Sequence, residues 1–451
     1  MYDVSYESSF FIAPAPKISF DKIKHLFCGI VSTVSFARLL VRISTTPYRQ
    51  ETRARHILSN LQIDKQIYIS YTLQAGGESI GSSLDISQSV HNDIGERTDW
   101  QLVTSKTQPT VLTSYKPAER GPPLCQLDWE LHINSEGVVQ EVPQLLDKIF
   151  RGGLEEGIRG EVWQFLLGYQ VWHQPTEVRE TNRRARVEEY FRMKLQWKSM
   201  SEDQQNRFAG FRERKTQIEK DIGRTDRTNA FYLGDNNSNV ALLQDILMTY
   251  VMYNFDLGYV QGMSDLLSPI LCVMKNEVDA FWCFVGFMDR VGTNFEFDQG
   301  GMKRQLDNLT EILRFIDPFF YNYLDAKDSG NLYFCFRWML IWFKREFSYP
   351  DTMMLWEVLW TKKPCRNFHL LVCAALLDTE KSAIVENKYG FTEILKHVND
   401  MSCRIDLQQT LAKAEGIYNS LKVCLDLSVK EIQFASSIKY HDLYQNNHIA
   451  G

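Results

Sequence analysis

Apolar side chains recur at helical spacing along most of the chain from about residue 128 onward. Within 240–255 they fall three or four residues apart on one face: Val240, Leu243, Leu247, Tyr250, Val251 and Phe255. This spacing predicts an amphipathic helix, and Asn237 or Ser238 can cap its start. The segments 279–288 and 332–347 are rich in aromatic residues and apolar on nearly every side, so we expect both to be central helices.

Two further amphipathic segments, 384–398 and 407–421, continue the helical pattern. Alternating strand patterns are nearly absent, and no repeat of fixed period is visible. The sequence therefore predicts an all-α fold of roughly 270–300 residues.

The first 125 residues follow a different pattern. An amphipathic stretch within 20–43 is followed at 76–83 by a glycine- and serine-rich run of linker composition. This is too little regular apolar pattern for a packed domain, so we expect the region to be poorly ordered in part. The predicted division is an N-terminal region at 1–125, a helical domain at 126–425 and a C-terminal tail at 426–451.

Composition and charge limit the classes of function that the chain can have. The 451 residues are 44% hydrophobic and 13% aromatic, which is ample for a core, and the formal net charge of −6 argues against a nucleic-acid binder. The segment 179–227 departs from this balance, with fourteen Lys or Arg against nine Asp or Glu. It is either a solvated helix held by ion pairs or a basic face that attracts an acidic partner.

The spacing of the cysteines and the residues at the N-terminus indicate the cellular compartment of the protein. Nine scattered cysteines form no C-x-x-C pair, and several lie in apolar runs, which predicts reduced, buried thiols. No positive residue precedes Lys17, so a secretory signal is not indicated. The apolar run 26–43 is interrupted by Arg38 and Arg42. We expect a cytoplasmic protein with no transmembrane segment that reaches membranes through partners.

Two short segments carry the candidate chemistry: Ile218-Glu219-Lys220-Asp221-Ile222-Gly223-Arg224 and Tyr259-Val260-Gln261-Gly262-Met263. The first ends in Arg224, and the second places Gln261 just after a predicted helix. An arginine can neutralise the charge that develops on a transferred phosphoryl group, and a glutamine can orient the attacking water. The sequence holds no P-loop and no G-x-G-x-x-G after a strand, so both groups are present without a nucleotide site.

Three ordered motifs resemble those of the TBC domain, the helical domain of Rab GTPase-activating proteins. The matches are Arg159 and Trp163 to R-x-x-x-W, Ile218, Asp221 and Arg224 to I-x-x-D-x-x-R, and Tyr259 and Gln261 to Y-x-Q. The runs 344–347 and 355–357 also resemble family segments. The resemblance covers roughly residues 140–400, and three motifs in order on a helical background are specific.

Longer runs, at 190–197, 256–263 and 334–338, are similar to the subgroup of TBC domain family members 15 and 17. That resemblance implies a late-endosomal Rab as partner and recruitment to late endosomal, lysosomal or mitochondrial surfaces. The subgroup carries a sizeable Rab-binding region ahead of its TBC domain. Only 125 residues precede the predicted domain here, so we expect most of that region to be missing.

The resemblance implies that Arg224 is an arginine finger and Gln261 a glutamine finger, both donated to a bound Rab. Asp221 would orient Arg224 from one helical turn away, and Tyr259 would hold Gln261. Gly262 gives the second motif backbone freedom. GTP and Mg²⁺ would belong to the Rab, so the chain would need no cofactor or metal of its own. It would be an activator and not an autonomous enzyme.

Other interpretations of these residues remain open. Arg227 is a rival for the finger role, and we assign it, with Ile218, to support or Rab contact. Arg159 and Trp163 are expected to tie helices together by charge and stacking. A catalytically silent Rab-binding scaffold would share the fold, although silent members usually lose either Arg224 or Gln261. A helical adaptor unrelated to GTPases is the third hypothesis.

A weaker motif lies in the N-terminal region. Trp100 and Val103 follow Asp99 in an aromatic-x-x-aliphatic pattern. This resembles the short motif that docks ubiquitin-like autophagy modifiers, which bind an added strand with two apolar pockets. The competing interpretation is a strand or linker with ordinary apolar residues.

Overall fold

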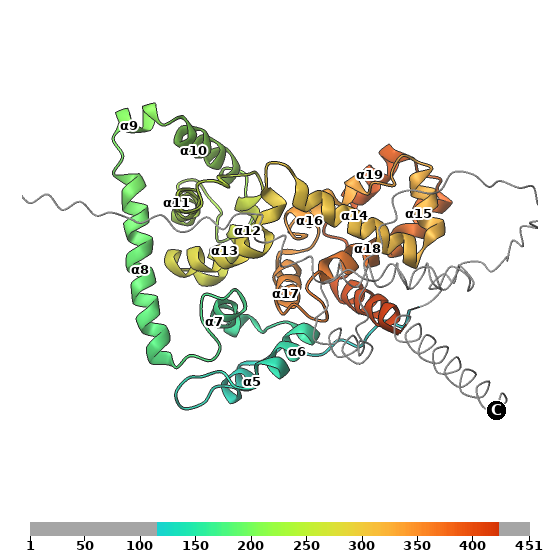
Figure 1. The fold of residues 1–451 in the computed structure, drawn as a ribbon, viewed down its shortest axis with the longest axis horizontal. Helices are drawn as coiled ribbons and strands as arrows, with labels where there is room; N and C mark the ends of the chain where they lie inside the picture. The colour runs from blue at the N-terminus through green and yellow to red at the C-terminus, as the bar shows by residue number, and fades with distance from the viewer. Residues whose placement is uncertain (1–114, 424–451) are drawn as a thin grey trace, which may run out of the picture. The chain divides into compact units, whose positions relative to one another are not determined.

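The computed structural model describes residues 115–423 (Figure 1). The predictions for the preceding region, including the Trp100–Val103 motif, and for most of the C-terminal tail fall outside that range. Within it the regular elements are helices. Extended pairing in the described range is limited to isolated bridges, Leu124 with Leu154 and Ile133 with Val139. The expected all-α fold is confirmed.

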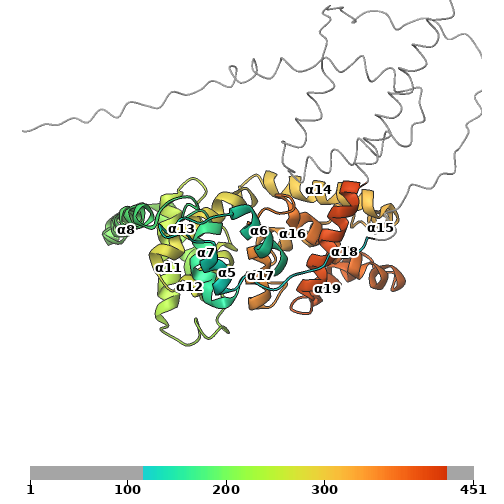
Figure 2. The same ribbon diagram turned by 90° about the horizontal axis from the view of Figure 1, so that it is seen from below.

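The helices follow one another as α5 (Gln126–Leu131), α6 (Val142–Gly152), α7 (Glu156–Leu166), α8 (Thr176–Lys198), α9 (Glu202–Arg207), α10 (Ala209–Ile222), α11 (Ser238–Tyr253), α12 (Met263–Met274), α13 (Glu277–Val291), η1 (Gly292–Phe295), α14 (Gly300–Ile316), α15 (Pro318–Asp325), η2 (Tyr333–Cys335), α16 (Phe336–Leu340), α17 (Tyr349–Trp360), α18 (Phe368–Glu386) and α19 (Phe391–Asp400). A further helix covers 407–423. Helices α8, α11, α12 and α13 gather at one end of the described region, and α14, α15, α18 and α19 at the other (Figures 1 and 2).

Helices α11, α12 and α13 form the core that carries the second motif. The predicted cap is present, since the Asn237 side chain accepts a hydrogen bond from the Asn239 N–H. Nine consecutive residues at the start of α12, from Met263 to Leu271, are buried. The long, exposed α8 packs across α11 and α13. Its charged side chains pair with theirs, as Arg183 does with Asp279 at 2.9 Å.

The prediction of a single helix over 332–347 is wrong. The short η2 and α16 occupy its first part, and the backbone then turns at Trp342 and Phe343, whose φ angles are +45° and +61°. Both side chains are buried. A run that is apolar on all sides is buried whatever its backbone does, so its composition does not determine a helical period.

The segment 384–398 is also broken where one helix was expected. Helix α18 ends at Glu386, Lys388 has φ of +54°, and α19 starts at Phe391. Gly390 donates its N–H to Glu393 Oε2 at 3.1 Å, which begins the new helix. The apolar spacing continued across the break and concealed it.

Residues 115–125 pack against the helical domain. The Ala118 N–H donates to the Ala412 carbonyl at 2.9 Å, and the Gly121 N–H donates to the Arg151 carbonyl at 3.1 Å. Leu124 is 1% exposed. The packed segment therefore begins before the boundary that was expected at residue 125. The sequence concealed this, because too few apolar residues lie there to form a visible pattern.

Candidate functional site

Arg224 follows the C-terminus of α10. Its side chain is 60% exposed and lies against Asp221, whose Oδ1 accepts hydrogen bonds from Nε at 3.1 Å and Nη2 at 2.6 Å. Gly223 between them is exposed, and a side chain there would make only ordinary contacts with the preceding turn. The guanidinium is thus held at one edge, and Nη1 has no partner within residues 115–423.

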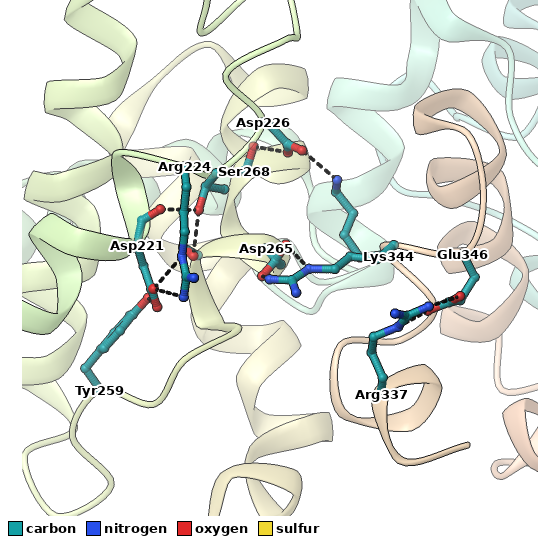
Figure 3. A network of polar contacts seen from close by, with 12 residues as sticks. Asp221, Arg224, Asp226, Tyr259, Asp265, Ser268, Arg337, Lys344 and Glu346 are labelled. Carbon is teal, nitrogen blue, oxygen red and sulfur yellow. Dashed lines mark hydrogen bonds and ion pairs between the residues drawn. The ribbon is translucent and has the colours of Figure 1, made fainter. Parts of the chain in front are cut away.

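Asp221 links the two motifs (Figure 3). Its carboxylate is buried, and its second oxygen, Oδ2, accepts a hydrogen bond of 2.7 Å from the Tyr259 hydroxyl. Burial, with the Asp221 carboxylate beside it, raises the pKa of Tyr259, so the hydroxyl keeps its proton and remains the donor. Ile218, on the same face of α10, is fully buried and anchors the helix in the core.

Gln261 stands on the loop between α11 and α12. It lies two residues before the first residue of α12 and eight residues beyond the last residue of α11, so the expected position just after a helix is wrong. The side chain is exposed, and no hydrogen bond from residues 115–423 holds its amide.

Two glycines shape this loop. Gly258 and Gly262 have φ of +68° and +107°. A Cβ on Gly262 would lie 2.8 Å from Ile341 Cγ2. Both this clash and the positive φ angle disfavour any residue other than glycine here. Gly262 is buried, and its conformation and lack of space for a side chain fix the backbone next to Gln261.

The backbone that follows Arg224 is held by a buried ion pair. Asp226 has φ of +48°, and its Oδ1 accepts a hydrogen bond of 2.9 Å from Lys344 Nζ. Its Oδ2 accepts a hydrogen bond of 2.6 Å from the Ser268 hydroxyl. The Lys344 side chain is 6% exposed. Because an ion pair buried this deeply stabilises one geometry, it orients the chain two residues beyond Arg224.

Two more arginine–carboxylate pairs flank this site (Figure 3). Arg345 donates to both carboxylate oxygens of Asp265 on α12, from Nε at 3.2 Å and from Nη2 at 2.9 Å, which raises the pKa of Arg345. Arg337 binds the fully buried Glu346 in the same way, at 2.7 Å for each contact. The Arg345–Asp265 pair ties the 342–347 turn to the start of α12, and the Arg337–Glu346 pair ties the same turn to α16.

Arg227 is turned away from this carboxylate network. Its Nη2 donates to the Gly234 carbonyl at 2.6 Å, which closes the loop that follows Arg224. The structure therefore brings Arg224, and not Arg227, onto Asp221.

Arg159 and Trp163 lie elsewhere, on α7. Both donate to the same oxygen of Glu357 on α17, at 2.5 Å from Arg159 Nε and 2.9 Å from Trp163 Nε1. The Leu154 N–H donates to the other oxygen at 2.9 Å. Burial raises the pKa of Glu357, and these three donors oppose that shift. The R-x-x-x-W motif thus ties α7 to α17.

The sequence assigned no role to Asp226, Asp265 or Glu357. The runs 344–347 and 355–357 resembled family segments, and they hold Lys344, Arg345 and Glu357, but their spacing gave no partner. Residues 115–423 contain no cluster of three His, Cys, Asp or Glu side chains that could hold a metal ion. No helix in that range is long and apolar enough to cross a membrane.

The site therefore presents an exposed guanidinium held by Asp221 and an exposed carboxamide on a loop shaped by two glycines. A profile of the Rab-GTPase-TBC domain matches residues 156–385, about half of the chain. The chain belongs to this family. The TBC match takes in Arg159, Arg224 and Gln261, and with them all three motifs.

TBC relatives with curated names extend the similarity. TBC1 domain family member 17 of Homo sapiens is 52% identical over 316 residues, which cover 70% of this chain and 49% of that protein. GTPase-activating protein GYP7 of Yarrowia lipolytica is 38% identical over 325 residues, which cover 66% and 44%. The expected similarity to the subgroup of members 15 and 17 is confirmed by member 17. The chain spans about half the length of the curated relatives it matches.

A solved TBC structure shares the fold. The crystal structure of the Ypt/Rab-GAP domain of Gyp1p aligns with a TM-score of 0.58 at 22% identity, covering 66% of this chain and 97% of that one. At this level of identity the likeness concerns the fold and leaves the partner open.

Proposed function

We propose that this chain accelerates GTP hydrolysis by a Rab GTPase and supplies Arg224 and Gln261 in trans. The observation that carries the proposal is the shared Asp221 carboxylate, which binds both Arg224 and the tyrosine two residues before Gln261. One buried group thus sets the positions of two exposed donors of the kind that phosphoryl transfer from GTP requires.

The roles follow from the geometry of each side chain. Arg224 rests on Asp221 through Nε and Nη2, so its Nη1 N–H groups are directed to a partner's phosphate oxygens. A planar fork of this kind is worth about 10³–10⁵ in rate when it is donated to a GTPase. Gln261 orients the attacking water with an amide that no neighbour in 115–423 engages. The nucleotide and Mg²⁺ are those of the Rab, so the chain is an activator and not an autonomous enzyme.

The similarity to the subgroup of members 15 and 17 supports a finer proposal. The partner is a late-endosomal Rab, and the protein acts in membrane trafficking. It is cytoplasmic and is recruited by partners to late endosomal, lysosomal or mitochondrial surfaces. The Trp100–Val103 motif would add contact with a ubiquitin-like autophagy modifier.

The test is single-turnover GTP hydrolysis across a panel of purified Rabs, with the Arg224→Ala chain as matched control. We expect at least one Rab to be accelerated by about 10³-fold or more at saturation, and the control to lose most of that effect. Binding without acceleration across the whole panel would instead identify a silent scaffold.

A further inference from the structure

Two apolar side chains beside the candidate site are exposed to solvent. Leu233, on the loop that follows Arg224, is 62% exposed, and Phe297, between η1 and α14, is 105% exposed. Single exposed apolar residues are common on proteins, so exposure alone carries no conclusion. These two side chains differ from the others because they stand on the loops next to Arg224 and Gln261, and because hydrogen bonds fix both loops.

The turn that carries Phe297 is anchored beneath the Gln261 loop. Phe295 is 3% exposed, and its Cε1 lies 3.7 Å from the position that a Cβ on Gly262 would take. Asn294 Nδ2 donates to the Met339 carbonyl at 2.9 Å. The Gln299 N–H donates to the Glu296 carbonyl at 3.0 Å and closes the turn. From these contacts the Cα atoms of Phe297 and Gly262 lie within about 17 Å of each other.

The loop that carries Leu233 is held at several points. Tyr232 is buried and donates its hydroxyl hydrogen to the Ser268 carbonyl at 2.7 Å. Asn237 Nδ2 donates to the Leu233 carbonyl at 2.9 Å, and Arg227 donates to the carbonyl of the next residue. An apolar side chain on such a fixed loop loses little conformational freedom when a partner covers it.

We propose that Leu233 and Phe297 form an apolar contact surface for the bound Rab, with Leu233 on the Arg224 side and Phe297 on the Gln261 side. This inference rests on the proposed function and names residues that determine affinity for the partner. A standard interface buries about 800 Å² on each partner, a patch roughly 30 Å across. Leu233 is on the same loop as Arg224, and Phe297 lies within that span of the Gln261 loop, so we expect a Rab that reaches both fingers to cover both side chains. Its nucleotide-bearing face must offer apolar side chains there.

The experiment uses the full chain with Leu233→Ser, Phe297→Ser and the double substitution. Phe319→Ser is the matched control, because Phe319 is 61% exposed on α15, at the end of the described region opposite α11 and α12 (Figures 1 and 2). The readouts are kcat and KM of stimulated hydrolysis, and Kd for the GTP-loaded Rab that responds most strongly to the unsubstituted chain.

We expect each substitution at the contact surface to raise KM and Kd about tenfold with kcat within about twofold, and the control to change nothing. Unchanged KM in both single variants, an equal effect of Phe319→Ser, or a loss confined to kcat would overturn the contact surface while leaving the activator role intact. If the unsubstituted chain neither binds nor stimulates any Rab, both proposals fall.

Discussion

The Tyr259 hydroxyl lies 2.7 Å from Asp221 Oδ2, on the carboxylate whose other oxygen binds Arg224. The two motifs are 38 residues apart in sequence at this contact, yet one buried group holds both. A change at Tyr259 is therefore transmitted to Arg224 through Asp221 and to Gln261 through the backbone.

The Tyr259→Phe substitution tests this link. It leaves a buried carboxylate oxygen without its donor, which should lower the free energy of unfolding by about 1.5–3 kcal/mol. Stimulated kcat should fall about tenfold, since both fingers lose a support. Urea unfolding and single-turnover hydrolysis are the measurements. Tyr253→Phe, at a half-exposed tyrosine, is the control and should leave both values near those of the unsubstituted chain.

The Arg224 side chain can be tested without disturbing the fold because it is mostly exposed. Arg224→Ala and Arg224→Lys should each lower stimulated hydrolysis by about two orders of magnitude or more, since lysine lacks the planar fork. Circular dichroism should stay native. Arg227→Ala is the internal control and should cost less. Hydrolysis that stays within a few-fold of normal in both Arg224 variants would remove the arginine finger from the mechanism.

Gln261 is tested with a Rab whose own catalytic glutamine is changed to alanine. If Gln261 orients water in its place, this Rab should still respond to the unsubstituted chain, and Gln261→Ala should abolish the response. The comparison requires only initial rates on the two forms of the Rab. An altered Rab that never responds would exclude the glutamine finger and leave Arg224 unaffected.

Motif order and apolar spacing were enough to predict the all-α class and to single out Arg224 and Gln261 as candidates. They could not predict the supports of the site. Lys344 and Asp226 are 118 residues apart, and nothing in either local pattern selects the other. The reversal at Trp342 and Phe343 was hidden for a similar reason. Burial on all sides removes the polar positions from which a helical period is recognised.

A buried histidine makes the fold sensitive to acid. Burial lowers the pKa of His369 to about 4, and its Nε2 lies 2.8 Å from Gln305 Oε1. In the unfolded chain a histidine takes up a proton near pH 6.5. The unfolded state therefore binds more protons between these values, and stability falls as the pH drops through them, by about 3 kcal/mol in total.

The measurement is urea unfolding at several pH values between about 7.5 and 4.5. His369→Gln keeps an amide that can donate to Gln305 and removes the titrating group. Its free energy of unfolding should depend less on pH within this window than that of the unsubstituted chain. Parallel curves for the two proteins would assign the acid sensitivity to other groups.

The packed segment 115–125 leads to a prediction about truncation. A chain that begins at Tyr115 keeps Leu124, whereas one that begins at Leu127 exposes the surface that Leu124 covers. The shorter chain should be less stable by about 2–5 kcal/mol, which is the usual cost of removing a buried leucine side chain. Leu124→Ala in the longer chain should reproduce most of the loss. Equal unfolding midpoints for both chains would show that the segment only rests on the domain.

Glu357 has a consequence for how the protein is made. Its three donors lie 194 to 203 residues earlier in the chain. At about 5–20 residues per second, a ribosome needs roughly 10–40 s to add the segment between them. During that time Arg159 and Trp163 have left the exit tunnel without their acceptor, so α7 cannot dock in its final place. The nascent chain must remain protected from aggregation until α17 emerges.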